Sequence, residues 1–284
     1  MIEVEQLSYR YPGSRNDTLQ NISFAIERGE IFGFLGPSGA GKSTLQKILI
    51  GMLRQFQGRV SVMGEELSRT GSDFYQRIGV AFEFPNFYGR FTALENLQLF
   101  HSLYAGKTKA PLEMLREVGL EEHQHTRVSD FSKGMKMRLN LCRALLHDPE
   151  LLFLDEPTSG LDPVNAKMVK RLILAGKTAG KTVLITTHNM QAADELCDRI
   201  AFVVDGRIVL IDTPRNLKLK HGARKLQVEY IQAGKVHNSE FPLEGIGHDQ
   251  HFLQILRHRQ VETIHTAEAT LEDVFVETTG RSLT

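Results

Sequence analysis

The pattern of apolar and polar residues predicts a series of strands over the first 212 residues of the chain. Residues 2–9 and 21–26 alternate apolar and polar side chains, as half-buried strands do. Residues 31–35 are apolar without interruption, which is typical of a short strand buried on both faces. Further strands are predicted at residues 59–63, 78–82, 151–154, 182–186, 199–204 and 207–211.

Helical spacing of apolar residues fills most of the segments between these strands. Thr92 and Glu95 form a capping-box pattern at the start of one helical region, and Asp162 precedes Pro163 as the N-cap of another helix. The predicted helical segments are 43–53, 92–120 (in two parts), 135–147, 163–175 and 190–196. Strands that alternate with helices indicate an α/β fold with a mostly parallel sheet.

The pattern changes near residue 213, where a short helix is followed by a different order of elements. We expect residues 1–221 to form one large domain with a helical insert at about 84–147. We expect residues 222–284 to form a small α+β appendage. Its predicted elements are strands at 225–231 and 235–241, a helix at 249–256, a strand at 261–265 and a helix at 271–277.

Composition and charge narrow the classes of function. Lys and Arg number 34, as do Asp and Glu, so the net charge is zero. Because no basic excess is available to neutralise phosphates, we expect no nucleic-acid partner. The first ten residues lack an apolar stretch and no apolar run reaches 18 residues, so we expect neither a secretory signal nor membrane insertion. Cys142 and Cys197 lie in apolar patterns and are predicted to be core residues.

The segment after the strand at 31–35 matches the phosphate-binding pattern G-x-x-x-x-G-K-[ST]. Glycines let the backbone approach phosphates closely, and the N-terminus of the following helix favours an anion. Lys42 can reach the β- and γ-phosphates, and the Ser43 hydroxyl is a suitable ligand for Mg²⁺. The pattern arises by chance in only about 1% of chains of this length. The predicted nucleotide-binding residues are Gly36, Pro37, Ser38, Gly39, Ala40, Gly41, Lys42, Ser43 and Thr44.

An acidic pair follows the apolar strand at 151–154. Asp155 is placed to hold Mg²⁺ through water, and Glu156 is placed to act as a general base on the attacking water. The alternative is an acidic turn before Pro157. His188 follows the next predicted strand, where its side chain could reach the γ-phosphate or orient the base. The alternative for His188 is an ordinary surface or core histidine.

In this order the motifs resemble the ATP-binding subunit of ABC transporters, over residues 1 to about 215. Tyr11 resembles the aromatic residue that stacks on adenine, and residues 131–135 resemble the signature loop. Residues 159–162 resemble the D-loop, and His188 resembles the switch histidine. The resemblance implies a P-loop NTPase fold of the ABC type, with a mostly parallel core sheet, N-terminal antiparallel strands and a helical insert.

The signature loop also makes physical sense as an anion site. Ser132, Lys133 and Gly134 precede or begin a predicted helix, whose N-terminus favours negative charge. In the family this loop meets the ATP held by a second copy, so the resemblance implies a homodimer, or a heterodimer with a similar ATPase. The resemblance also implies that Asp162 of the D-loop is among the cofactor-binding residues. The alternative for Ser132 is a simple helix N-cap, and both roles are compatible.

The sequence departs from the family pattern at several positions. Lys133 and Met135 replace Gly and Gln in the signature loop, which resembles ATPases of ABC-2 type exporters. Glu83 occupies the Q-loop position, where Gln is usual. A carboxylate can also ligate Mg²⁺, although it adds negative charge near the triphosphate. The alternative is a solvated acid at a strand end. Residues 269–281 resemble the C-terminal ending of the same exporter group.

These features predict an ATP- and Mg²⁺-dependent ATPase subunit of an ABC-2 type exporter. It would act on the cytoplasmic face of a membrane, bound to separate permease subunits. Residues 84–130 are the expected coupling surface, where aromatic side chains either dock the permease or simply pack between core and insert. These aromatic residues are Phe84, Phe87, Tyr88 and Phe91. Alternatives are an importer ATPase, a soluble ABC ATPase, and a protein that binds ATP with little turnover.

Overall fold

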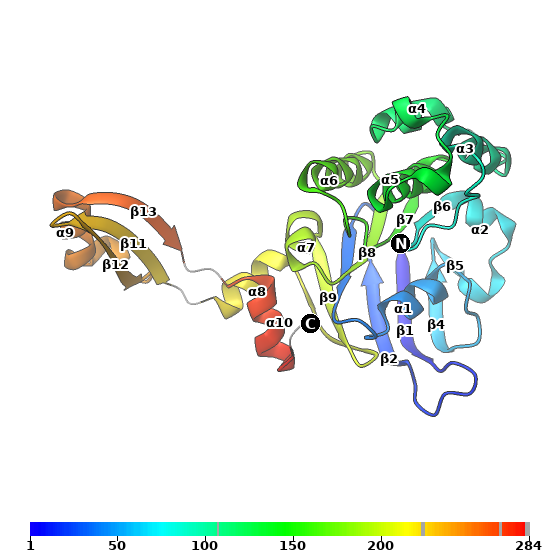
Figure 1. Cartoon of the computed structure of the whole chain (residues 1–284). Coiled ribbons are helices and arrows are strands. Elements are labelled where there is room, and N and C mark those ends of the chain that lie inside the picture. Colours follow the sequence, from blue (N-terminus) through cyan, green and yellow to red (C-terminus); the bar gives the residue numbers. More distant parts are fainter. Residues whose placement is uncertain (107, 223–224, 267–268, 282–284) are drawn as a thin grey trace. The chain divides into compact units, whose positions relative to one another are not determined.

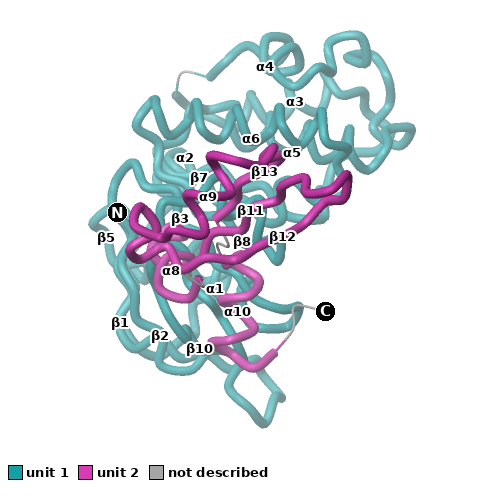
Figure 2. The backbone as a smooth tube through the Cα atoms, turned by 90° about the vertical axis from the view of Figure 1, so that its left-hand side faces the viewer, with its two compact units in different colours: residues 1–212, 283–284 teal, residues 213–282 magenta. Residues whose placement is uncertain are grey.

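The computed structural model describes residues 1–106, 108–222, 225–266 and 269–281. Within them the chain forms two compact units, residues 1–212 and residues 213–281 (Figure 2). The division therefore lies before the helix α8 (Pro214–His221), not after it as the sequence suggested. The reason is that α8 packs on α10 (Leu271–Thr279) of the second unit, where His221 Nδ1 lies 2.9 Å from Glu277 Oε2.

The main sheet of unit 1 has the strand order β10-β9-β3-β8-β7-β6. All neighbouring pairs are parallel except β9 and β10, which are joined by a tight turn and run antiparallel. The apolar runs predicted from the sequence form the central strands, with every residue of β3 buried. The strands are β3 (Ile31–Leu35), β6 (Ile78–Ala81), β7 (Leu151–Asp155), β8 (Thr182–Thr187), β9 (Arg199–Val204) and β10 (Arg207–Asp212).

A second, antiparallel sheet of order β2-β1-β4-β5 is built from the amphipathic N-terminal strands. One buried apolar cluster contains residues of this sheet, of the main sheet and of helix α1 (Lys42–Leu49). Within it the rings of Phe24, Phe32 and Phe34 lie 5.1–5.9 Å apart. The strands are β1 (Ile2–Tyr9), β2 (Leu19–Ile26), β4 (Gln57–Val62) and β5 (Glu65–Glu66).

The helical insert gathers at one end of unit 1, at the top in Figure 1. Thr92 caps α3 with the predicted capping box, and Asp162 caps α6 with its carboxylate. Helix α5 packs on β6 and so connects the insert to the main sheet. The helices are α2 (Ser72–Arg77), which the sequence did not predict, α3 (Ala93–Ser102), α4 (Pro111–Glu117), α5 (Lys133–Leu145), α6 (Pro163–Thr178) and α7 (Met190–Leu196). Short 3₁₀ helices span Leu67–Arg69, Glu121–His123 and Val128–Asp130.

Unit 2 is a small α+β structure, as the sequence predicted. Its antiparallel sheet has the order β12-β11-β13, and α9 covers one face through a core of Val228, Tyr230, Phe241 and Ile255. The elements are β11 (Lys225–Gln232), β12 (Lys235–Pro242), a 3₁₀ helix (Ile246–His248), α9 (Gln250–His258) and β13 (Gln260–Thr266). Residues 223–224, 267–268 and 282–284 of the predicted appendage lie outside the described residues.

Both cysteines are buried and free, in agreement with their predicted place in the core. Burial raises the pKa of each thiol well above its usual range, so neither is a reactive thiolate. Among the helices of the described residues, none has both the length and the apolar character needed to cross a bilayer.

Candidate active site

The carboxyl ends of three neighbouring parallel strands meet at one edge of the main sheet. Leu35 at the end of β3 pairs with Thr187 of β8, and Asp155 at the end of β7 pairs with Thr186. The segments that follow these strands therefore lie together and surround a cavity of about 510 Å³. The cavity is lined by Thr18, Ser38, Gly39, Ala40, Gly41, Lys42, Ser43, Thr44, Glu83, Asp155, Glu156 and His188.

The phosphate loop depends on glycine at two positions. A Cβ on Gly36 would lie 2.1 Å from the carbonyl oxygen of Val203, so no larger residue fits there. Gly41 has φ +104° and is the N-cap of α1, without any side chain that caps the helix. The first N–H groups of α1 thus stay available, and together with the helix dipole they favour an anion at the cavity.

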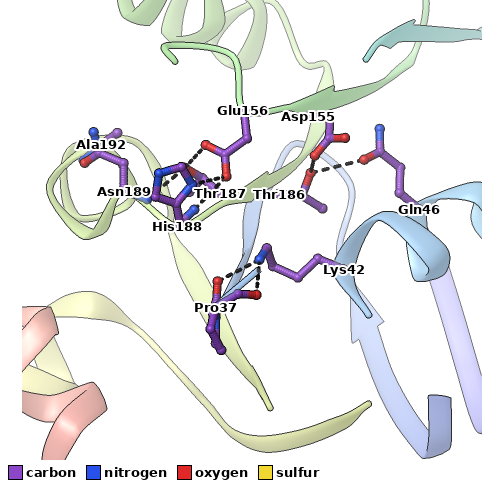
Figure 3. A network of polar contacts seen from close by, with 11 residues as sticks. Pro37, Lys42, Gln46, Asp155, Glu156, Thr186, Thr187, His188, Asn189 and Ala192 are labelled. Carbon is purple, nitrogen blue, oxygen red and sulfur yellow. Dashed lines mark hydrogen bonds and ion pairs between the residues drawn. The ribbon is translucent and has the colours of Figure 1, made fainter. Parts of the chain in front are cut away.

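Lys42 is almost fully buried and directs its ammonium back along its own loop. Its Nζ donates to the carbonyl oxygens of Gly36 at 2.6 Å and Pro37 at 2.9 Å (Figure 3). An ammonium has three protons, so these two bonds leave one for a phosphate oxygen. Burial lowers the pKa of Lys42, although the nearby carboxylates of Glu156, Asp155 and Glu83 act in the opposite direction.

Asp155 is partly buried at the end of β7 and lines the cavity. Burial raises its pKa above the usual range, and a hydrogen bond from the Thr186 hydroxyl opposes this effect. The oxygens of Ser43, Glu83 and Asp155 line the same cavity as the phosphate loop. Hard oxygen ligands with room for phosphate and water fit Mg²⁺, which uses few protein ligands. Within the described residues, no group of three or more His, Cys, Asp or Glu side chains could hold a metal by itself.

Glu156 adopts a left-handed backbone conformation, with φ +48°, directly after β7. Such a conformation costs a non-glycine residue about 1–3 kcal/mol, and hydrogen bonds to the side chain offset that cost. Thr187 Oγ1 donates to Glu156 Oε2 at 2.8 Å, while the backbone N–H of His188 donates to Oε1 at 2.8 Å. His188 Nδ1 lies 2.6 Å from the same Oε1 (Figure 3).

This arrangement indicates which nitrogen of the His188 ring carries a proton. A carboxylate only accepts hydrogen bonds, so Nδ1 of His188 carries the proton that faces Glu156. The His188 side chain is 59% exposed, whereas the Glu156 side chain is 10% exposed. In the neutral ring Nε2 is then an acceptor, and a hydrogen bond from Nε2 to a phosphate oxygen requires the imidazolium form.

Tyr11 lies beside the phosphate loop but does not line the cavity. Its hydroxyl is 3.2 Å from Thr44 Oγ1, and its ring makes an edge contact with Tyr9, with ring centroids 4.9 Å apart. Thr44 itself is a lining residue. Tyr11 is thus held next to the site by its hydroxyl and by the neighbouring ring.

The signature and D-loop residues do not line the cavity of their own chain. The Ser132 hydroxyl accepts from Met135 N and caps α5, so the N-cap alternative is correct for this contact. The two loops lie against each other, since a Cβ on Gly160 would be 3.2 Å from the Lys133 side chain. Asp162 accepts from Val164 N and Asn165 N, each at 3.0 Å. The signature loop and the D-loop are thus neighbours in the structure.

The aromatic residues of the predicted coupling surface divide into two groups. Phe87 is packed, with the Phe100 ring 6.3 Å away and the Arg143 guanidinium 5.3 Å from its centroid. Phe84, Tyr88 and Phe91 are instead 77%, 56% and 41% exposed. Packing therefore explains Phe87. Tyr88 and Phe91 stack on each other, with ring centroids 5.4 Å apart, yet both stay exposed, as does Phe84.

Four residues of the site were not predicted from the sequence. Thr18 lines the cavity from the segment before β2, and the side chains of Thr187, Thr186 and Gln46 hold the acidic pair. The only sequence signal for a role of Thr186 and Thr187 in the site is that the apolar strand at 182–187 ends in these two polar residues. Nothing in the sequence indicates Thr18, because its contribution depends on how β2 lies against Gly41 and Gly206.

Comparison with known proteins agrees with this geometry. A family model described as ABC transporter matches residues 19–159, and one described as the fluoroquinolone efflux ABC transporter C-terminal domain matches residues 224–268. A fluoroquinolones export ATP-binding protein of Mycobacterium tuberculosis (strain CDC 1551 / Oshkosh) is 53% identical over 285 residues, which cover 100% of this chain and 95% of the relative.

Two solved structures resemble unit 1. An ATP-binding subunit of an ABC transporter has a TM-score of 0.70 at 30% identity and covers 78% of this chain and 92% of its own. A dimeric ATP-binding cassette in a post-hydrolysis state, bound to ADP and Pi, has a TM-score of 0.67 at 26% identity, with 75% and 98% covered. The predicted fold class is therefore confirmed. Because the 53% identical relative spans the chain from end to end, this chain belongs to the ABC transporter family, as an ATP-binding subunit.

Proposed function

We propose that this chain binds Mg²⁺·ATP in the cavity at the end of β3 and hydrolyses it to drive export through separate membrane subunits. ATP hydrolysis is the activity of its family. The observation that carries the proposal is that Lys42, the adjacent pair Asp155 and Glu156, and His188, from three separate segments, line one cavity. Lys42→Ala should abolish ATP binding measured by calorimetry, and unchanged affinity in a folded variant would contradict the proposal.

The nucleotide is held by the loop from Gly36 to Thr44 and by the N-terminus of α1. The backbone N–H groups and Lys42 face the phosphates, while the Tyr11 ring stacks on the adenine. Mg²⁺ would be held by Ser43 and Asp155, with Glu83 as a further oxygen ligand, and it would neutralise charge on the phosphates. Glu83 lines the cavity and directly precedes the predicted coupling surface in the sequence.

Glu156 acts as the general base on the attacking water. Of its approximately four lone-pair sites, two on Oε1 accept from His188 and one on Oε2 accepts from Thr187. One site on Oε2 is left to accept a proton from water. His188 orients Glu156 from one side, and its exposed Nε2 faces the position of the γ-phosphate.

The active form is a dimer in which each signature loop meets the ATP bound by the other chain. Support comes from the dimeric ATP-binding cassette at 26% identity. A second observation is that the cavity is not lined by Ser132, Lys133, Gly134 or Asp162 of its own chain. The partner is a second copy or a similar ATPase. Loss of the γ-phosphate removes the contacts of Ser132 and His188, and the dimer opens.

The transported substrate is proposed to resemble a fluoroquinolone. The support is the similarity of unit 2 to a fluoroquinolone efflux C-terminal domain and the end-to-end similarity to a fluoroquinolones export protein. The chain would sit peripherally on the cytoplasmic face of the membrane, where exposed Phe84, Tyr88 and Phe91 dock the permease. The C-terminal similarity to an efflux domain favours export over import.

Drug accumulation tests the export proposal. Cells that express the chain with its permease should accumulate less fluoroquinolone than cells that express Glu156→Gln with the same permease. Equal accumulation, with both proteins present at the membrane, would contradict the proposed substrate. ATP hydrolysis by the purified chain is a separate measurement, so the substrate and the ATPase activity are tested independently.

A further inference from the structure

We propose that Gln46 is a positioning residue that holds Asp155 through the hydroxyl of Thr186 and thereby raises the affinity for Mg²⁺·ATP. The proposal rests on the Mg²⁺ role proposed above for Asp155. Gln46 lies in α1, is only 1% exposed, and has Oε1 3.1 Å from Thr186 Oγ1. The same Thr186 oxygen is hydrogen-bonded to Asp155 Oδ1, so the three side chains form one row (Figure 3).

The number of protons fixes the direction of these two hydrogen bonds. The Thr186 hydroxyl carries a single proton, and an Asp155 carboxylate that faces Mg²⁺ can only accept. The hydroxyl therefore donates to Asp155, and its oxygen accepts from the amide of Gln46. This requires the nitrogen of the amide to face Thr186, which a half-turn of the planar group achieves without any change of shape.

The half-turn also satisfies a second group. With Oε1 toward Thr186, Gln46 Nε2 is buried and has no hydrogen-bond partner. An orphaned buried donor costs about 1–3 kcal/mol, which is large for one side chain. With Nε2 toward Thr186 this donor has a partner, and the carbonyl oxygen Oε1 takes the position without one. The row then runs from Gln46 N–H to Thr186 and from Thr186 O–H to Asp155.

This row connects the two protein segments that supply the proposed Mg²⁺ ligands. Gln46 belongs to the same helix as Ser43, and α1 packs on β8, which carries Thr186. Asp155 ends the neighbouring strand β7. Because successive hydrogen bonds polarise one another in a buried site, the amide strengthens the bond from Thr186 to Asp155. Gln46 thus fixes the distance between the Ser43 hydroxyl and the Asp155 carboxylate.

A thermodynamic cycle on the full chain tests this role without turnover. In a Glu156→Gln background, ATP affinity is measured by calorimetry with excess Mg²⁺ and again with EDTA, and the ratio gives the gain in affinity due to Mg²⁺. Gln46→Met keeps the volume but removes the amide, and Thr186→Val removes the hydroxyl. Each should reduce the gain about three- to tenfold, as expected for one buried hydrogen bond. ATP affinity in EDTA should change less than about twofold, because the row does not touch the phosphate loop.

The double variant decides whether Gln46 acts through Thr186. The combination of Gln46→Met with Thr186→Val should lose no more of the gain than Thr186→Val alone, and Thr186→Ser should keep it. Gln46→Leu replaces Gln46→Met if thermal unfolding shows that the latter is not folded. Asp155→Asn tests the underlying Mg²⁺ role: an unchanged gain in this variant would contradict the proposed function. A loss in Asp155→Asn together with an unchanged gain in Gln46→Met, or additive losses in the double variant, would overturn the inference.

Discussion

His188 Nδ1 and Glu156 Oε1 lie 2.6 Å apart, and the backbone N–H of His188 donates to the same carboxylate oxygen at 2.8 Å. The histidine thus contacts the proposed base twice, once through its ring and once through its backbone. The backbone contact persists in any substitution, whereas the ring contact does not. Variants of His188 can therefore separate the position of Glu156 from the contact of the ring with phosphate.

His188→Ala should lower kcat by about 10²-fold or more, because both the orienting contact and the phosphate contact of the ring are lost. ATP affinity should stay within about threefold, since the phosphate loop is unchanged. Asn189→Ala is the matched control: Asn189 caps α7 by accepting from Ala192 N at 2.9 Å. It should cost about 1 kcal/mol of stability with little loss of turnover. Equal turnover in His188→Ala and the wild type would remove His188 from the mechanism.

The lowered pKa of Lys42 predicts two opposite responses to alkaline pH. The ammonium is lost at a lower pH than in an ordinary lysine, so ATP affinity should begin to fall below the usual lysine pKa. The folded state binds its proton less tightly than the unfolded state, so the contribution of Lys42 to stability should rise over the same pH range. Calorimetric ATP binding and chemical unfolding across this range measure both. An affinity that stays constant up to the usual lysine pKa would contradict the burial effect.

Glu83→Gln tests the unusual residue of the Q-loop position. Glu83 lines the cavity and its charge favours protonated Lys42, so the carboxylate acts inside the site. If it ligates Mg²⁺, the amide should change the Mg²⁺ concentration for half-maximal ATPase rate, and hydrolysis should rise as repulsion of the γ-phosphate is relieved. The measurement is ATPase rate against Mg²⁺ at fixed ATP. An isolated surface charge would leave the curves of Glu83→Gln and the wild type within about twofold of each other. Such a result would contradict a role of Glu83 in Mg²⁺ binding or hydrolysis.

Removal of unit 2 should leave ATP binding intact. Every residue that lines the cavity belongs to unit 1, which ends at Asp212 in the described part of the chain. A protein of residues 1–212 should therefore bind ATP within a few-fold of the full chain. A truncation after His221 would keep α8 without its partner α10, and it should be less soluble than the shorter one. A folded 1–212 protein that fails to bind ATP would contradict this division of roles.

Much of the fold could be predicted because the buried strands have distinctive sequences. The apolar runs in β3, β7 and β8 indicate strands buried on both faces, and they also predict which loops meet at the sheet edge. Helix α2 was not predicted, because six mostly polar residues do not show a helical period. The start of the second unit was predicted too late in the sequence for a different reason. Helix α8 belongs to this unit only because it contacts α10, which is distant from it in the sequence.

The residues that we propose to act directly were easier to predict than those that support them. Lys42 and Asp155 stand in local patterns whose chemistry can be inferred from neighbours in the sequence. Gln46 and Thr186 contact each other across 140 positions, and Glu156 turns toward His188 through a left-handed backbone that no local pattern predicts. Supporting contacts of this kind require the three-dimensional structure.

The most direct test of the account is the comparison of turnover with ATP binding in Glu156→Gln. The substitution removes the base but keeps the phosphate loop, Lys42 and Asp155. We predict that kcat falls about 10²–10⁴-fold, that ATP affinity measured by calorimetry stays within about threefold, and that ATP then traps a dimer visible by light scattering. Turnover at the wild-type rate, or loss of ATP binding in the folded variant, would contradict the assignment of Glu156 as the base of an ATP-hydrolysing site.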